Sequence, residues 1–233
     1  MARYAKMTSK IKPRRTDIPA AFRDLLRADP YRAPFASIQK QLSSFDSGRR
    51  RALAGLSETA LRSPLHRKEE PRIGVVKLLV ALLPESFPAI SSLLRSSTPT
   101  SMSEVHFSLF CFLEEAQFIE RHPSLRQRVL REVVAYVYRA KSDPALAAWM
   151  AGDLLGEHWA PRAGWPALMR LARRARHPAG RIAAVHGLRH AVGKAKRNRR
   201  SALLRVLNDV ASKDSSRKVR NSARVALASR VVI

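Results

Sequence analysis

The chain of 233 residues carries 44 Lys and Arg against 18 Asp and Glu, and its formal net charge at pH 7 is +26. Hydrophobic residues make up 45% of the chain, which is enough to bury a core and excludes a wholly disordered protein. The single cysteine, Cys111, excludes an internal disulfide and a cysteine-based zinc site. We expect it to be a buried, inert thiol in a reducing, cytoplasmic setting.

Residues 1–16 are basic and contain few large apolar side chains, which predicts a flexible N-terminal arm. A transit peptide is the alternative interpretation of this segment. Residues 17–233 predict a single helical domain, and the polar segment 95–103 is the candidate boundary within it.

Apolar residues recur every three or four positions after residue 16, and alternating β-branched runs are missing. The predicted fold class is therefore all-α, with about eleven or twelve helices joined by short loops. The most apolar run, 73–83, contains Lys77 and is too short to span a bilayer, which predicts a buried core helix. In chain order, the predicted helices cover residues 20–27, 35–45, 49–62, 73–83, 84–95, 104–121, 124–141, 145–156, 164–177, 181–190, 197–213 and 219–229.

Three blocks in the last third of the chain repeat one another: "ALAAWMAGDLLG", "RIAAVHGLRH" and "VRNSARVALAS". When they are aligned, alanines share one column and leucines share another column four residues on, at intervals of 33 and 39 residues. Recurrence at roughly 30–40 residues indicates stacked helical hairpins, because one hairpin cannot bury its apolar face alone. The two columns hold Ala151, Ala184 and Ala223, and Leu155, Leu188 and Leu227.

Together with the polar turns before them, "DPALAAWMAGDLLG", "HPAGRIAAVHGL" and "DSSRKVRNSARVAL" resemble the first helix of HEAT-like (PBS-lyase/HEAT type) repeats. Val219-Arg220 is the clearest copy of the family pattern, whereas Arg189 and Ala228 replace the closing glycine, Gly156, of the first block. The resemblance covers about residues 120–233. It implies a curved α-solenoid whose second helices line the concave, partner-binding side, and it implies no single activity.

Positive charge collects on the second helices of the predicted pairs. Between Glu157 and Asp209 there are thirteen Lys and Arg and no acid. In the helix 164–177, an apolar stripe around Leu168 and Leu171 directs the arginines away from the core. Guanidinium groups bind phosphate oxygens through paired hydrogen bonds, so these arginines suit a nucleic-acid backbone. The predicted nucleic-acid-binding residues are Arg170, Arg173, Arg174, Arg176, Lys194, Lys196, Arg197, Arg199, Arg200 and Arg205.

HEAT-like alkylpurine DNA glycosylases, which are basic helical proteins of this size, offer an enzymatic alternative. They use a Trp and an Asp on the concave side, and here Trp149 and Asp153 stand one helical turn apart. These two residues lie on a first helix, which the resemblance places on the convex side, so we expect no catalytic residue. We expect Trp149, Trp159 and Trp165 to pack in the core, and stacking on nucleic-acid bases is their alternative role.

His186 and His190 are four residues apart on one predicted helix, a spacing that can chelate a metal ion. No acid lies near them in the sequence, and the surrounding arginines oppose a cation. The sequence therefore predicts neither a metal site nor another cofactor.

These observations predict a non-catalytic protein that binds DNA or RNA through a basic concave groove, largely without sequence specificity, with the nucleoid as one setting. A scaffold that binds an acidic protein partner is the first alternative, and a DNA glycosylase is the second. A further interpretation assigns the positive charge no binding role: the surface is basic only because the whole proteome is arginine-rich.

Overall fold

The computed structural model describes residues 35–62, 72–96, 102–117, 121–141, 145–159 and 163–229. Within these ranges the chain forms α-helices and no strand, which confirms the all-α class. No helix in this part is long and apolar enough to cross a membrane. The predicted arm 1–16, the predicted helix 20–27 and most of the segment 95–103 lie outside the described residues. The described residues form eleven helices: α2 (Phe35–Leu42), α3 (Ser47–Arg62), α4 (Arg72–Ala81), α5 (Phe87–Arg95), α6 (Ser103–Glu115), α8 (Arg126–Arg139), α9 (Ala145–Glu157), α10 (Gly164–Arg174), α11 (Pro178–Lys194), α12 (Arg197–Lys213) and α13 (Arg217–Ala228).

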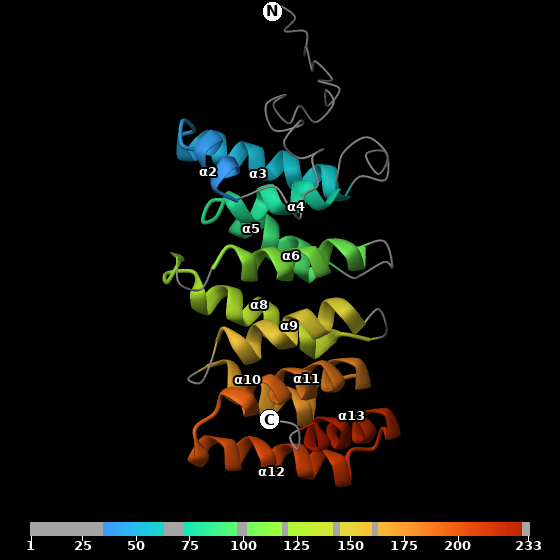
Figure 1. Cartoon of the computed structure of the whole chain (residues 1–233). Coiled ribbons are helices and arrows are strands. Elements are labelled where there is room, and N and C mark those ends of the chain that lie inside the picture. Colours follow the sequence, from blue (N-terminus) through green and yellow to red (C-terminus); the bar gives the residue numbers. More distant parts are fainter. Residues whose placement is uncertain are drawn as a thin grey trace, which may run out of the picture.

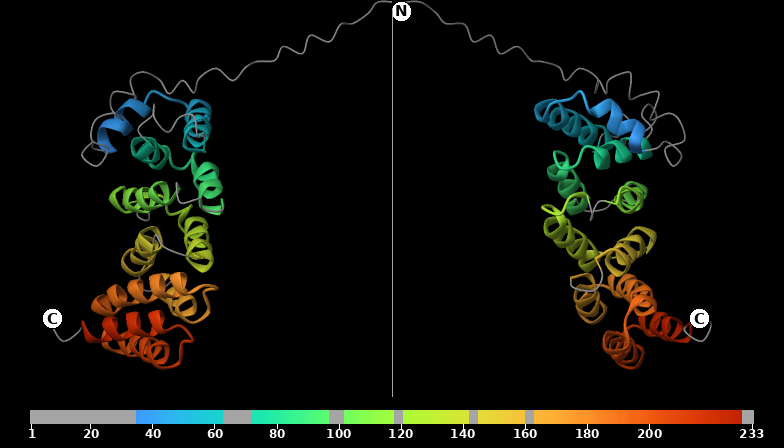
Figure 2. Two further views of the ribbon diagram at one scale, coloured as in Figure 1. Left: turned by 90° about the vertical axis from the view of Figure 1, so that its right-hand side faces the viewer. Right: turned by 60° about the vertical axis from the view of Figure 1, so that its left-hand side comes forward.

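The helices lie one above another, from α2 and α3 at one end to α12 and α13 at the other (Figure 1). Two columns run side by side in the views of Figure 2. In the first column α2, α4, α6, α9, α11 and α13 contact one another in turn, and in the second column α3, α5, α8, α10 and α12 do so. The chain therefore alternates between the columns from α3 to α6 and from α8 to α13.

Buried apolar side chains form one continuous cluster from Phe35 in α2 to Ala226 in α13. The alanine column of the repeats is fully buried, and so are Leu155 and Leu188, whereas Leu227 is only partly buried. Five of the six side chains in the two aligned columns are therefore part of the core.

Glycines let α9 and α11 touch along their backbones. A Cβ atom on Gly152 would lie 2.3 Å from the Ala183 carbonyl oxygen, and one on Gly187 would lie 2.3 Å from the Gly152 carbonyl oxygen. A Cβ atom on Gly156 would meet the Gly187 carbonyl oxygen at the same distance. Because no other residue lacks a Cβ, these three positions fix how closely the two helices approach.

The core also encloses charged and polar groups. Lys77 is 1% exposed, and its Nζ lies 2.9 Å from Glu115 Oε1. The same Nζ is 4.8 Å from the ring centroid of Phe35 and 5.0 Å from that of Phe112, so two aromatic faces and a carboxylate surround this ammonium group. Lys77 lies on α4, and this helix is buried, as the sequence predicted.

His106 joins α6 to both α5 and α8 in the core. Its Nε2 lies 3.0 Å from the Leu93 carbonyl oxygen, and its Nδ1 lies 3.2 Å from the Tyr136 hydroxyl. Burial lowers the pKa of His106 to about 4. The neutral imidazole consequently donates a hydrogen bond from Nε2 to the carbonyl oxygen and accepts a hydrogen bond from the Tyr136 hydroxyl at Nδ1.

We predict that Gly152→Ala lowers the free energy of unfolding by about 1–3 kcal/mol, because the new methyl group overlaps the backbone of α11. Gly55→Ala is the control, since nothing lies within 4 Å of a Cβ atom at Gly55. It should stabilise the protein by up to about 1 kcal/mol through helix propensity. Urea unfolding measures the free energy of unfolding of both variants. Equal stabilisation by the two substitutions would contradict the close backbone contact.

We predict that His106 makes folding acid-sensitive. The unfolded chain takes up the imidazole proton near pH 6.5 and the folded chain only near pH 4, so stability falls as the pH drops between these values. The loss should be about 3 kcal/mol, and His106→Gln should remove it. Urea unfolding curves at several pH values from 7 to 4 measure this, and the same pH slope in both proteins would refute the assignment.

Candidate nucleic-acid interface

The second column carries arginines on its outward side. In α10 the predicted apolar stripe is confirmed: Leu168, Leu171 and Ala172 are buried, as is Ala175 just after the helix. The four predicted arginines of this segment are exposed. The hydrophobic face therefore points inward, and the guanidinium groups stand in solvent. They are Arg170, Arg173, Arg174 and Arg176.

The remaining predicted binding residues fall into two groups. Those in the turn before α12 and on α12 itself are exposed and belong to the second column. Lys194 does not join them, because its Nζ lies 3.0 Å from Glu157 Oε2 on α9, in the first column. The exposed residues of the turn before α12 and of α12 are Lys196, Arg197, Arg199, Arg200 and Arg205.

Few of these cations are neutralised. Arg173 Nε lies 3.1 Å from Asp209 Oδ2, which ties α10 to α12. Hydrogen bonds from Lys213 and from Arg173 lower the pKa of the Asp209 carboxyl group, so it is ionised at neutral pH. Apart from Arg173 and Lys194, no predicted binding residue has a carboxylate of a described residue within 4.0 Å. Their charge is available to a ligand.

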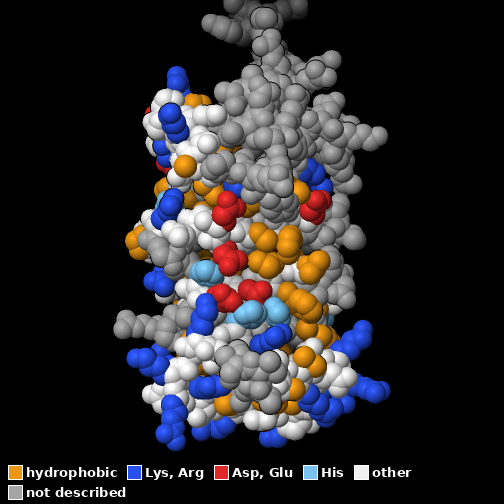
Figure 3. Space-filling model, in the orientation of Figure 1, with side chains coloured by type: hydrophobic (Ala, Val, Ile, Leu, Met, Phe, Trp, Pro, Cys, Tyr) orange, Lys and Arg blue, Asp and Glu red, His pale blue; other side chains and the backbone are white. Residues whose placement is uncertain are grey.

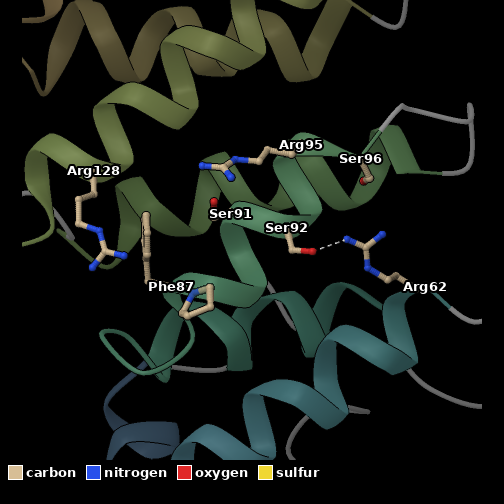
Figure 4. A pocket seen from close by; sticks show the side chains of 8 residues that line it. Arg62, Phe87, Ser91, Ser92, Arg95, Ser96 and Arg128 are labelled. Atoms are coloured by element: carbon tan, nitrogen blue, oxygen red, sulfur yellow. Dashed lines mark hydrogen bonds between the residues drawn. The ribbon is translucent and has the colours of Figure 1, made fainter.

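Two neighbouring hollows on α5 and α8 extend the basic surface, and the sequence did not indicate them. The larger, with a volume of about 630 Å³, is lined by Arg62, Arg95 and Arg128 together with serines of α5 (Figure 4). The smaller, of about 350 Å³, shares Arg95 and Arg128 and adds Arg131 and Arg139. The outward side of α5, α8, α10 and α12, with the arginines of these hollows and the predicted second-column cations, is called the arginine face below.

Internal contacts hold the side chains of the larger hollow in position. The Arg128 guanidinium lies 4.2 Å from the centroid of the Phe87 ring, and Arg62 Nη2 donates to Ser92 Oγ at 2.9 Å. Arg95 pairs with the nearly buried Glu132, and hydrogen bonds from Arg95 lower the pKa of that carboxyl group. Glu132 thus offsets one of the five arginines and leaves the hollows with a net positive charge.

Acidic and histidine side chains gather on the first column instead, in a band across α6, α9 and α11 (Figure 3). His158 Nε2 lies 3.1 Å from Glu114 Oε1, and His186 Nε2 lies 3.0 Å from Asp153 Oδ1. His190 Nδ1 lies 2.7 Å from Glu157 Oε1. Burial would raise the pKa of Glu157, but the hydrogen bond and charge of Lys194 and the nearby imidazoles lower it overall. No acid lies near His186 and His190 in the sequence, but the adjacent helix α9 brings two carboxylates to them in space, those of Asp153 and Glu157.

The three tryptophans differ in their surroundings. Trp159 and Trp165 are buried as expected, and the Trp165 indole donates to the Gly156 carbonyl oxygen at 2.9 Å. Trp149 is 37% exposed and stacks on the His186 ring, with 5.0 Å between the centroids. The prediction of core packing is therefore wrong for Trp149.

Cys111 is half-buried rather than fully buried. Burial, followed by the charge of Glu114, raises the pKa of its thiol to about 11. The thiol stays protonated at neutral pH, so it is the poor nucleophile that the sequence predicted.

No protein-family model matches the sequence, and no curated protein or solved structure matches it either. Function is therefore inferred from the chemistry of the two columns.

Proposed function

We propose that this protein is a HEAT-like α-solenoid that binds nucleic acid, without catalysis and largely without sequence specificity, through the arginine face. The observation that carries the proposal is the row of exposed arginines on consecutive second-column helices. Three of them, Arg131 in α8 and Arg170 and Arg174 in α10, have no carboxylate of a described residue within 4.0 Å. In the same proposal, residues 1–16 form a basic arm and 17–233 form one domain.

The chemistry of the arginine face suits phosphate groups. Guanidinium groups bind phosphate oxygens in bidentate fashion, and each neutralised phosphate releases a counterion. Packed helices lie about 8–10 Å apart, so arginines on α8, α10 and α12 present charge at intervals along the column. The Ser92 hydroxyl in the larger hollow, which accepts from Arg62, adds a neutral hydrogen-bond donor of the kind that contacts phosphates.

The contacts of Asp153 favour binding over a glycosylase reaction. In the glycosylases, the equivalent Asp faces the substrate, whereas Asp153 lies between the imidazoles of His186 and His190. It also stands on the first column, apart from the arginine face. A substrate backbone held by the second column would not be directed to this carboxylate.

We predict that affinity for a generic duplex falls by about two orders of magnitude or more between 50 and 200 mM salt, as for proteins that make six or more phosphate contacts. Fluorescence anisotropy with a labelled oligonucleotide over a salt series measures this. An affinity that barely responds to salt would instead favour a folded, acidic protein partner.

We predict that the triple variant Arg131→Gln, Arg170→Gln and Arg174→Gln weakens binding to all sequences alike and reduces the salt slope by about three contacts. Gln has nearly the helix propensity of Arg, so the fold should survive.

The matched control replaces Arg189, Arg217 and Arg224 with Gln. These arginines are exposed on α11 and α13 of the first column, and the control removes the same amount of charge. We expect the control to bind nearly as well as the unmodified protein. If the control loses as much affinity as the test variant, the total charge of the protein determines binding, and the arginine face is not the binding site.

A further inference from the structure

Two first-column helices bring three metal-ligating side chains together. His186 and His190 are four residues apart on α11, so their rings lie on the same side of this helix. Asp153 projects from the adjacent α9 toward both rings. One ligand atom from each of the three residues lies within 4.8 Å of the others.

The distances around Asp153 place both imidazoles within reach of a common ion, and His186 Nε2 also lies within hydrogen-bond distance of Asp153 Oδ2, at 3.3 Å. Asp153 Oδ1 lies 3.0 Å from His186 Nε2 and 3.3 Å from His190 Nε2. This oxygen is buried, and among the described residues no donor makes a well-aligned hydrogen bond to it. Around a tetrahedral Zn²⁺ with bonds of 2.0–2.1 Å, neighbouring ligand atoms are about 3.3 Å apart, close to the 3.0 and 3.3 Å that separate Asp153 Oδ1 from the two imidazole nitrogens.

The surrounding groups orient these ligands as the outer partners of a metal site do. His190 Nδ1 lies 2.7 Å from Glu157 Oε1, and the other oxygen of Glu157 accepts a hydrogen bond from Lys194 at 3.0 Å. A metal-bound imidazole usually donates its second N–H to a carboxylate in this way, which leaves Nε2 free to bind the metal. The stacked indole of Trp149 fixes the His186 ring.

We propose that Asp153, His186 and His190 form a site for a divalent transition-metal ion, with Zn²⁺ as the ion that the two-imidazole, one-carboxylate set favours. Asp153 and Glu157 offset the positive charge of the rest of the chain at this point. The three ligands are partly exposed, so the ion reaches them from solvent and a water molecule completes the tetrahedron. The ion clamps α9 to α11, and its binding is separate from the arginine face.

Zinc titration of the chelator-treated, dialysed full chain by isothermal calorimetry tests the proposal. We expect one Zn²⁺ to bind per chain and to raise the melting temperature, and Co²⁺ in its place to give the intense visible bands of a tetrahedral complex. His190→Gln and Asp153→Asn should abolish the one-to-one binding, and Glu157→Gln should weaken it about 10–100-fold.

His158→Gln is the control. His158 pairs with Glu114 in a neighbouring cluster that contains Glu157 but none of the proposed ligands, so this variant should keep full zinc affinity. Circular dichroism checks that every variant folds. If the unmodified protein binds no Zn²⁺, the three side chains form only a histidine–carboxylate network and the proposal is wrong. Unchanged binding in His190→Gln, or its loss in His158→Gln, would likewise overturn it.

Discussion

The backbone contact between α9 and α11 is the constraint on which the arrangement of the first column depends. With glycine at 152, 156 and 187, the two helices meet without intervening side chains. Residues at equivalent positions of successive repeats then stand face to face. Asp153 meets His186, and Glu157 meets His190, in each pair 33 residues apart. A bulkier residue at any of the three glycines would separate these pairs.

A largely buried ion pair joins the next layer of the stack. Arg181 at the start of α11 makes two hydrogen bonds to Asp214, which lies 33 residues later in the turn before α13. This pair is largely buried, and the Arg181 side chain also donates to the Ala175 carbonyl oxygen. Ion pairs in this part of the chain therefore connect successive layers, and these ion pairs engage the few acidic residues present.

The sequence predicted the helices best where the apolar stripe is uninterrupted, as in 197–213, whose predicted and observed limits agree. It failed at helix ends that carry no proline or glycine signal. The helix predicted over 104–121 ends at Glu115, and Gln117 adopts a left-handed backbone with φ of 48°. Conversely, α11 extends from Pro178 to Lys194, beyond both limits of the predicted helix 181–190, and it runs through Gly193, where a Cβ atom would have nothing within 4 Å.

The candidate sites were predictable to different extents. The outward direction of the α10 arginines follows from the apolar stripe of one helix, so the sequence was sufficient. The histidine–carboxylate cluster depends on contact between two repeats. Its acids are distant in sequence from the histidines, although the repeat alignment already placed Asp153 and His186 in one column. The hollows around Arg95 and Arg128 depend on how α5 packs on α8, which no local pattern encodes.

Arginine-specific labelling with phenylglyoxal, with and without a saturating duplex, tests the role of the arginine face most directly because it probes the unmodified protein. Peptide mass spectrometry reports the labelling of each residue. We expect the duplex to protect Arg131, Arg170 and Arg174, whereas Arg189 and Arg224 on the first column stay reactive. Equal protection of both columns, or protection of the first column alone, would contradict nucleic-acid binding by the arginine face.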